Sequence, residues 1–256
     1  LNIWLNFKNI NNLNSALKLI DTIPKRFNNI KIIQNTFAHC HFDSPKTDEM
    51  FKQLTSNPDV NYSRYSFFYS NYLLSKNNEK KTKEVLISSL KKNPNSLILN
   101  QLKIDLIKKN FFYNKFDCKN ITNVIAEMFY VTANALAAQK NHVISNFYLD
   151  LARYLNPNFV SYDALYAENF FLIKEYEKAK KIYTKMKQKG SVYNWYASKQ
   201  IASIFSSQDK KKDAINSLKN SFKKIENPTI YEIFDYAVFL KNNNKYKESI
   251  KYYSKA

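Results

Sequence analysis

The chain has 256 residues, of which 45% are hydrophobic and 16% aromatic, so it can bury a core and is not a disordered protein. Gly190 is its one glycine, which argues against an all-β fold, a P-loop or a dinucleotide-binding turn, because these need residues that reach positive φ or lack a side chain. The net charge of +19 comes mostly from lysine, and we attribute most of it to an A/T-rich codon background and to solvated helix faces rather than to nucleic-acid binding.

Residues 1–94 are predicted to form divergent helical hairpins. The stretch "LNSALKLIDTIP" (13–24) has the pattern of the second helix of an incomplete unit, and 29–58 that of another unit whose register the pattern does not fix. The stretch "RYSFFYSNYLLSKNNEKKTKEVLISSLKKNP" (64–94) predicts a further hairpin, with Ser70 and Thr82 where its helices cross.

Residues 95–124 interrupt the series of predicted helical hairpins. Ser70 and Ala133 lie 63 positions apart, which is short of two full units. The segment between them contains one apolar helical stretch, "SLILNQLKIDLIKKN", followed by "FFYNKFDCKNITN". It predicts a partial unit and an irregular crossing before a long helix that begins near Ile121.

Residues 125–256 contain a repeat of 34 to 35 residues. Each predicted hairpin carries one small residue in each helix, where a bulky side chain would keep the helices apart. The first helices supply Ala133, Ala167, Ala202 and Ala237, and the second helices supply Ser145, Ala179, Ala214 and Ser249, both in steps of 34, 35 and 35. This period predicts an all-α, right-handed solenoid of antiparallel helix pairs, because one pair cannot bury its apolar face alone.

These segments resemble the tetratricopeptide repeat (TPR) family. The resemblance rests on "FYVTANALAAQKNHVISNFYLDLARYLNP", "YDALYAENFFLIKEYEKAKKIYTKM", "ASKQIASIFSSQDKKKDAINSLKNSF" and "IFDYAVFLKNNNKYKESIKYYSKA". The family's usual glycine after the first small position and its tryptophan near the start of the first helix are missing. The order of segments is also similar to long bacterial TPR proteins, best represented in alphaproteobacteria, which usually carry a secretion signal and further repeats.

The resemblance implies that the first helix of each unit lines a concave groove. In this register the side chains expected to face a ligand are Arg64, Phe67, Asn71, Tyr130, Asn134, Glu168, Phe171, Tyr196, Lys199, Ser203, Phe234 and Lys241. Asn, Tyr and Lys at such positions could bind a peptide backbone or a terminal carboxylate. The clamp by which some TPR proteins bind chaperone tails needs Asn four residues after Lys. Ser203 follows Lys199 at that spacing, so we expect no such clamp.

No catalytic, cofactor or metal site is predicted. The chain has three histidines, and it lacks a nucleophile elbow, an HExxH motif and a glycine-rich loop. His39 and His41 flank Cys40, but residues two apart on a helix point in different directions. We therefore expect a helix end with a buried cysteine and partly exposed histidines. Cys40 and Cys118 suggest neither a disulfide framework nor a zinc site, and a single disulfide between them stays open.

These patterns predict a non-enzymatic scaffold that binds another protein or a peptide in its groove. One alternative is a lysine-rich array that binds an anionic partner such as RNA, an acidic protein, lipopolysaccharide or a membrane surface. Another is a module that positions an enzyme domain elsewhere in a longer chain. We expect no transmembrane segment, since no stretch reaches 18 consecutive apolar residues.

The first residue, Leu1, and the helical pattern that runs to Ala256 suggest a fragment of a longer protein. The localisation would be periplasmic or membrane-associated if the full chain carries the secretion signal usual in the resembling group, and otherwise cytoplasmic.

Overall fold

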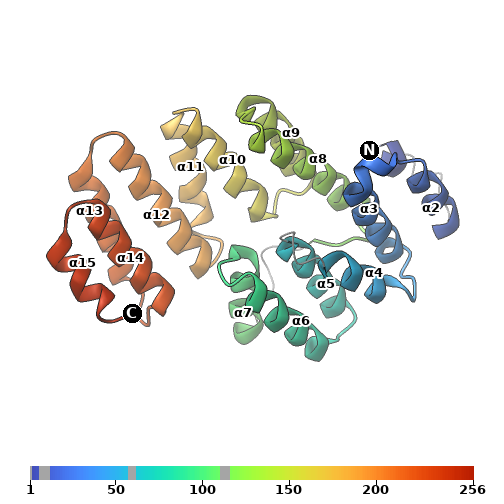
Figure 1. Cartoon of the computed structure of the whole chain (residues 1–256), viewed down its shortest axis with the longest axis horizontal. Helices are drawn as coiled ribbons and strands as arrows, with labels where there is room; N and C mark the ends of the chain where they lie inside the picture. The colour runs from blue at the N-terminus through green and yellow to red at the C-terminus, as the bar shows by residue number, and fades with distance from the viewer. Residues whose placement is uncertain (1, 6–11, 57–61, 110–115) are drawn as a thin grey trace. The chain divides into compact units, whose positions relative to one another are not determined.

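All the regular secondary structure in the described residues is helical. The computed structural model describes residues 2–5, 12–56, 62–109 and 116–256 (Figure 1). Its elements are α1 (Asn2–Leu5), α2 (Leu13–Asp21), the 3-10 helix η2 (Lys25–Phe27), α3 (Asn28–His41), α4 (Thr47–Ser56), α5 (Ser63–Ser75), α6 (Glu79–Lys92), α7 (Leu97–Lys108), α8 (Ile121–Ala138), α9 (His142–Leu155), α10 (Val160–Leu172), α11 (Tyr176–Met186), α12 (Ser191–Ser207), α13 (Lys211–Lys223), α14 (Ile230–Asn242) and α15 (Tyr246–Tyr253). The predicted all-α class is confirmed for these residues.

The chain divides into two compact units. The first unit comprises residues 1–162 and the second residues 163–256, so the boundary falls near the start of α10. Neighbouring helices pack as hairpins within each unit, including α3 with α4, α5 with α6 and α8 with α9 in the first, and α12 with α13 and α14 with α15 in the second. The predicted division into 1–94, 95–124 and 125–256 follows the repeat pattern instead, and residues 110–115 of its middle segment lie outside the described residues.

The predicted small residues are buried. Ser70, Thr82, Ala133, Ser145, Ala167, Ala179, Ala202, Ala214, Ala237 and Ser249 are each at most 2% exposed. In two hairpins the second helix also bonds to the first at this point, because the Ser145 hydroxyl donates to the Ala133 carbonyl at 2.8 Å and that of Ser249 to Ala237 at 2.8 Å. A larger side chain would displace the facing helix.

Each of these first helices ends in the same turn, seven residues after its small residue. Asn77, Lys140, Lys174, Asp209 and Asn244 all have φ between 56° and 64°. The next residue then donates its N–H to a carbonyl five positions back, as Asn78 does to Leu73 at 2.9 Å and Lys245 to Leu240 at 2.9 Å. This left-handed helix end usually needs glycine, and here Asn, Asp and Lys adopt it.

The same turn determines the register that the sequence pattern left open in 29–58. Asp43 has φ 53°, and the Ser44 N–H donates to the His39 carbonyl at 2.9 Å. Thr36, seven residues before Asp43, is 1% exposed, as is Thr47 at the start of α4. Residues 28–56 are therefore a hairpin of the same kind, with threonine in place of alanine.

α8 is the most apolar long helix described. By length and composition alone it could cross a membrane, and it is the one such helix in the described part of the chain. In the structure α8 packs against α9 and α1, and it carries Glu127, which is 0% exposed and ion-paired. These contacts make it a central helix of the first unit.

Candidate functional site

Arg64 of α5 lies in an aromatic cluster inside the first unit. Its guanidinium donates two hydrogen bonds of 2.6 Å to the carboxylate of Glu127 in α8, and a third to the Ser161 hydroxyl in α10. The Tyr130 ring lies 3.7 Å from the guanidinium carbon, and the Phe159 ring 4.6 Å from it. The pair joins three helices, and both charges are satisfied without an external ligand.

This cluster corrects part of the predicted groove. The Arg64 side chain is only 12% exposed, and it is bound at both edges. Phe67 is 2% exposed and stacks on Phe159 with 5.8 Å between ring centroids. Neither residue presents a free, outward-facing side chain. The charge of Arg64 is neutralised inside the protein, because a buried guanidinium requires a partner.

The other predicted groove residues fall into two groups. Asn134, Glu168, Phe234 and Lys241 are exposed, whereas Asn71, Tyr130, Phe171, Tyr196, Lys199 and Ser203 are partly buried. Lys199 is ion-paired with Asp235 of α14, which also accepts a 3.1 Å hydrogen bond from the Trp195 indole N–H. Burial raises the pKa of Tyr196 to about 12, so its hydroxyl stays protonated at neutral pH.

A cavity of about 640 Å³ lies within the first unit, between α5 and α7. Pockets of this size are typical of ligand sites. Its lining residues are Phe67, Phe68, Asn71, Tyr72, Leu74, Ser75, Asn77, Glu79, Leu102, Asp105, Phe116, Asp117 and Cys118. Two of them, Phe67 and Asn71, belong to the predicted groove; Asn71 donates to the Phe67 carbonyl at 3.1 Å. The cavity has an apolar interior with amide, hydroxyl and carboxylate groups around it.

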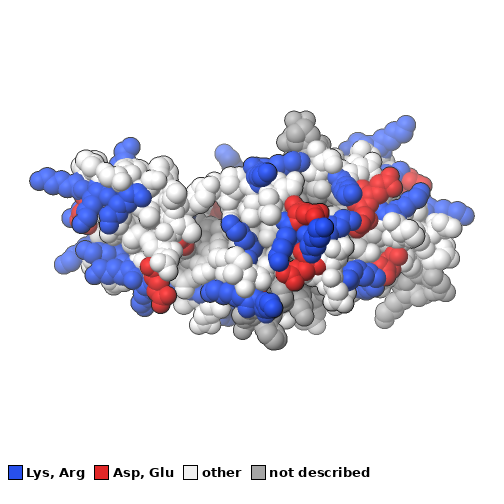
Figure 2. Space-filling model, turned by 90° about the horizontal axis from the view of Figure 1, so that it is seen from below, with Lys and Arg blue, Asp and Glu red and all other residues white. Residues whose placement is uncertain are grey.

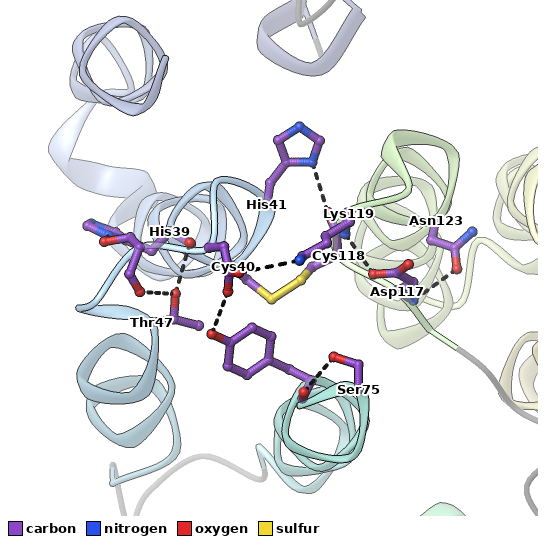
Figure 3. The surroundings of a disulfide bond; sticks show 12 residues. His39, Cys40, His41, Thr47, Ser75, Asp117, Cys118, Lys119 and Asn123 are labelled. Atoms are coloured by element: carbon purple, nitrogen blue, oxygen red, sulfur yellow. Dashed lines mark hydrogen bonds and ion pairs between the residues drawn. A yellow bond between two sulfur atoms is a disulfide. The ribbon is translucent and has the colours of Figure 1, made fainter. Parts of the chain in front are cut away.

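One wall of the cavity is attached to α3 by a disulfide bond. Cys40 at the end of α3 is bonded to Cys118, with 5.9 Å between their Cα atoms, and both are buried (Figure 3). The segment before α8 is thereby fixed beside α3, and the Phe116 ring of this segment stacks on Phe68 of α5. The imidazole of His41 donates from Nδ1 to the Cys118 carbonyl at 3.1 Å, which adds a second link between the two segments.

The surroundings of Cys40 differ in part from the prediction. Cys40 is buried, as expected, but His39 is only 7% exposed rather than partly exposed. The reason is that its ring bonds to the Ser44 hydroxyl at 2.9 Å, and its carbonyl accepts from Thr47. Burial lowers the pKa of His39, which favours the neutral imidazole. In the described residues no group of His, Cys, Asp and Glu could bind a metal ion.

Asp43 connects three segments near the disulfide. Its carboxylate accepts hydrogen bonds from Lys76 and from the Tyr72 hydroxyl, the latter at 2.9 Å, and Lys119 lies 3.4 Å away. The hydrogen bonds from Lys76 and Tyr72 lower the pKa of Asp43 to about 2. Asp43 therefore stays ionised and links the α3–α4 turn to α5 and to the segment after Cys118.

The sequence patterns did not predict the cavity or the role of its carboxylates. Asp105 and Asp117 lie in the segment predicted as irregular, where no repeat register assigns a facing direction. The sequence did contain a usable signal, the two cysteines Cys40 and Cys118. A disulfide between them requires residues 116–120 to lie beside α3, although the two segments are far apart in the chain.

Comparison with known proteins adds no assignment: no family model matches the chain, and no curated protein matches it.

Proposed function

We propose that this protein is a non-enzymatic scaffold of TPR-like hairpins that binds a protein or peptide partner. The observation that carries the proposal is the cavity of about 640 Å³ between α5, the first helix of its predicted hairpin, and α7, the helix of the partial unit that follows it. A preformed cavity on rigid helices binds an extended chain at little cost in conformational entropy. We also propose that the hairpins stack as a right-handed solenoid and that the chain is related to the TPR family.

The repeated turn supports the TPR-like interpretation. Left-handed residues at Lys140, Lys174, Asp209 and Asn244 follow one another in steps of 34, 35 and 35. The left-handed turns thus recur with the same period as the buried small residues. A turn conformation and a small side chain have different physical origins, so their agreement supports the repeat. Stacked units of this kind form extended concave binding surfaces.

The disulfide supports folding in an oxidising compartment. Bonds such as Cys40–Cys118 persist in secreted and periplasmic proteins and are rare in the reducing cytosol. We therefore propose a periplasmic or otherwise exported location, in agreement with the secretion signal that the family resemblance implies.

A peptide-selection experiment tests the binding function. Random peptides would be displayed and selected on the full chain, and then measured against two variants. Ser75→Trp places a large side chain in the lining of the cavity, and Ser88→Trp makes the same change on an exposed face of α6. We expect Ser75→Trp to weaken binding at least about tenfold, because it occupies the ligand's space, while Ser88→Trp leaves binding unchanged.

The salt dependence distinguishes a peptide partner from an anionic one. Peptide binding should change by less than about tenfold between 50 and 200 mM salt, whereas a complex with many phosphate contacts would lose about a thousandfold or more. Figure 2 shows Lys and Arg side chains dispersed over the visible face, with Asp and Glu among them. Failure to select any peptide, or equal binding to both tryptophan variants, would contradict the proposed function.

A further inference from the structure

The charged residues that line the cavity are acidic in the part of the chain that the structure describes. The chain has 40 Lys and Arg against 21 Asp and Glu, so an arbitrary surface site is more often basic. Among the described residues, however, the cavity is lined by Glu79, Asp105 and Asp117 and by no Lys or Arg. The charge on the described lining is therefore opposite in sign to that of the chain as a whole.

Two of the three carboxylates have no ion-pair partner among the described residues. Glu79 is neutralised by Lys83 at 2.7 Å. Asp105 accepts a 2.8 Å hydrogen bond from the Gln101 amide, and Asp117 accepts a 2.9 Å bond from the Lys119 backbone N–H. Neither is ion-paired with a lysine of the described residues, although lysines are abundant on the neighbouring helices.

Asp105 is the more buried of these two carboxylates. It is partly buried on α7, and desolvation raises its pKa above the ordinary value, while Gln101 and Lys108 offset only part of this effect. A partly desolvated carboxylate whose charge is only partly offset by its neighbours lowers the stability of the free protein and is better accommodated when a cation binds.

The interior of the cavity is apolar and aromatic. Phe67, Phe68, Leu102 and Phe116 are at most 4% exposed and form its closely packed floor, while the partly buried Tyr72 and Leu74 present the more accessible apolar surface. Such a surface accommodates the methylene stem of a long side chain or an adjacent apolar residue. Aromatic faces also attract cations.

We propose that this cavity binds a Lys or Arg side chain of an apolar peptide segment, with the cationic group at Asp105 and Asp117 and its stem along the partly buried side chains of Tyr72 and Leu74. This inference rests on the proposed peptide-binding function and specifies its ligand. The positive charge elsewhere on the molecule repels such a peptide, so its cation is directed to this cavity, where Asp105 and Asp117 form no ion pair with any residue that the structure describes.

Three matched peptides test the charge preference. Each is acetylated and amidated and has two Phe residues flanking a central position occupied by Lys, norleucine or Glu. Their dissociation constants for the full chain would be measured by calorimetry at fixed salt and pH 7. We expect the Lys peptide to bind at least about tenfold more tightly than the norleucine peptide, and the Glu peptide most weakly, because a charge-assisted hydrogen bond to Asp105 is formed only by Lys.

Two protein variants locate the effect. Asp105→Asn should remove most of the advantage of the Lys peptide and leave the norleucine peptide unaffected. Asp213→Asn makes the same change on an exposed face of α13 and should alter neither. Urea unfolding would show that Asp105→Asn is folded; Asp117→Asn serves as a second cavity variant if it is not.

Distinct outcomes separate this inference from the proposed function. Equal binding of the three peptides, still blocked by Ser75→Trp, would overturn the charge preference and leave the peptide-binding function intact. Tighter binding of the Glu peptide would also overturn it. If 4-phenylbutylamine binds and depends on Asp105 but no peptide binds, the occupant is a small amine, and both the inference and the proposed function are contradicted.

Discussion

Arg64 shows how the local sequence can suggest one role for a residue while packing gives it another. Its position on the first helix of a repeat predicted a ligand contact. In the structure its charge is satisfied by the buried Glu127, 63 positions later, and it is surrounded by aromatic rings. The register on α5 identified a face of the helix, but the residues opposite that face come from α8 and α10.

Breaking this pair should destabilise the first unit strongly. Glu127→Gln leaves a buried guanidinium without a counter-charge, and we expect the free energy of unfolding to fall by about 3–5 kcal/mol. Trp4, which is buried in the first unit, can report the transition by fluorescence in a Trp195→Phe background.

The matched control is Glu84→Gln, on an exposed position of α6, which should change stability by less than about 0.5 kcal/mol. The double variant Arg64→Met with Glu127→Leu should recover much of the loss, because apolar residues of similar volume need no counter-charge. A loss below about 1 kcal/mol for Glu127→Gln would show that the pair is not essential to the fold.

The individual helices end in a conformation that their sequences do not favour. Asn, Asp and Lys occupy left-handed positions where glycine costs least, and Gly190 is used elsewhere, before α12. The hairpin geometry imposes these turns, because the second helix must return along the first for the small residues to meet. The scarcity of glycine in the chain is compatible with repeated tight turns for this reason.

The same substitution should therefore have opposite effects at two positions around the same hairpin. Lys174→Gly replaces a residue with φ 64° and should raise the free energy of unfolding of the second unit by up to about 1 kcal/mol. Lys181→Gly, on an exposed position inside α11, should lower it by about 1 kcal/mol. Urea unfolding followed by Trp195 fluorescence measures both, and destabilisation by Lys174→Gly would contradict the assigned turn.

The molecule as a whole consists of two units, and only the first contains a disulfide. The Cys40–Cys118 bond closes a loop with a sequence separation of 78 residues, so it limits the unfolded ensemble of the first unit and not that of the second. The bond also fixes residues 116–118, which form a wall of the cavity.

Removing the disulfide should lower the stability of one unit selectively. In the double variant Cys40→Ala, Cys118→Ala, the first unit should lose about 4 kcal/mol of unfolding free energy, from the loop length. The Trp195 transition of the second unit should not change. The fluorescence of Trp4 and Trp195, each measured with the other replaced by Phe, separates the two. An equal shift in both transitions would show that the units unfold as one.

The sequence alone determined the helical class and the hairpin period, because both depend on local features: scarce glycine, and small residues such as Ala133 and Ala202 at constant spacing. The sequence also predicted that Asn71 faces a ligand, and in the structure Asn71 lines the cavity. The disulfide, the Arg64–Glu127 pair and the acidic lining of the cavity by Asp105 and Asp117 depend on contacts between segments distant in the chain or on an irregular stretch without a repeat register. Such contacts follow from how the helices pack in three dimensions, which the local periodicity does not specify.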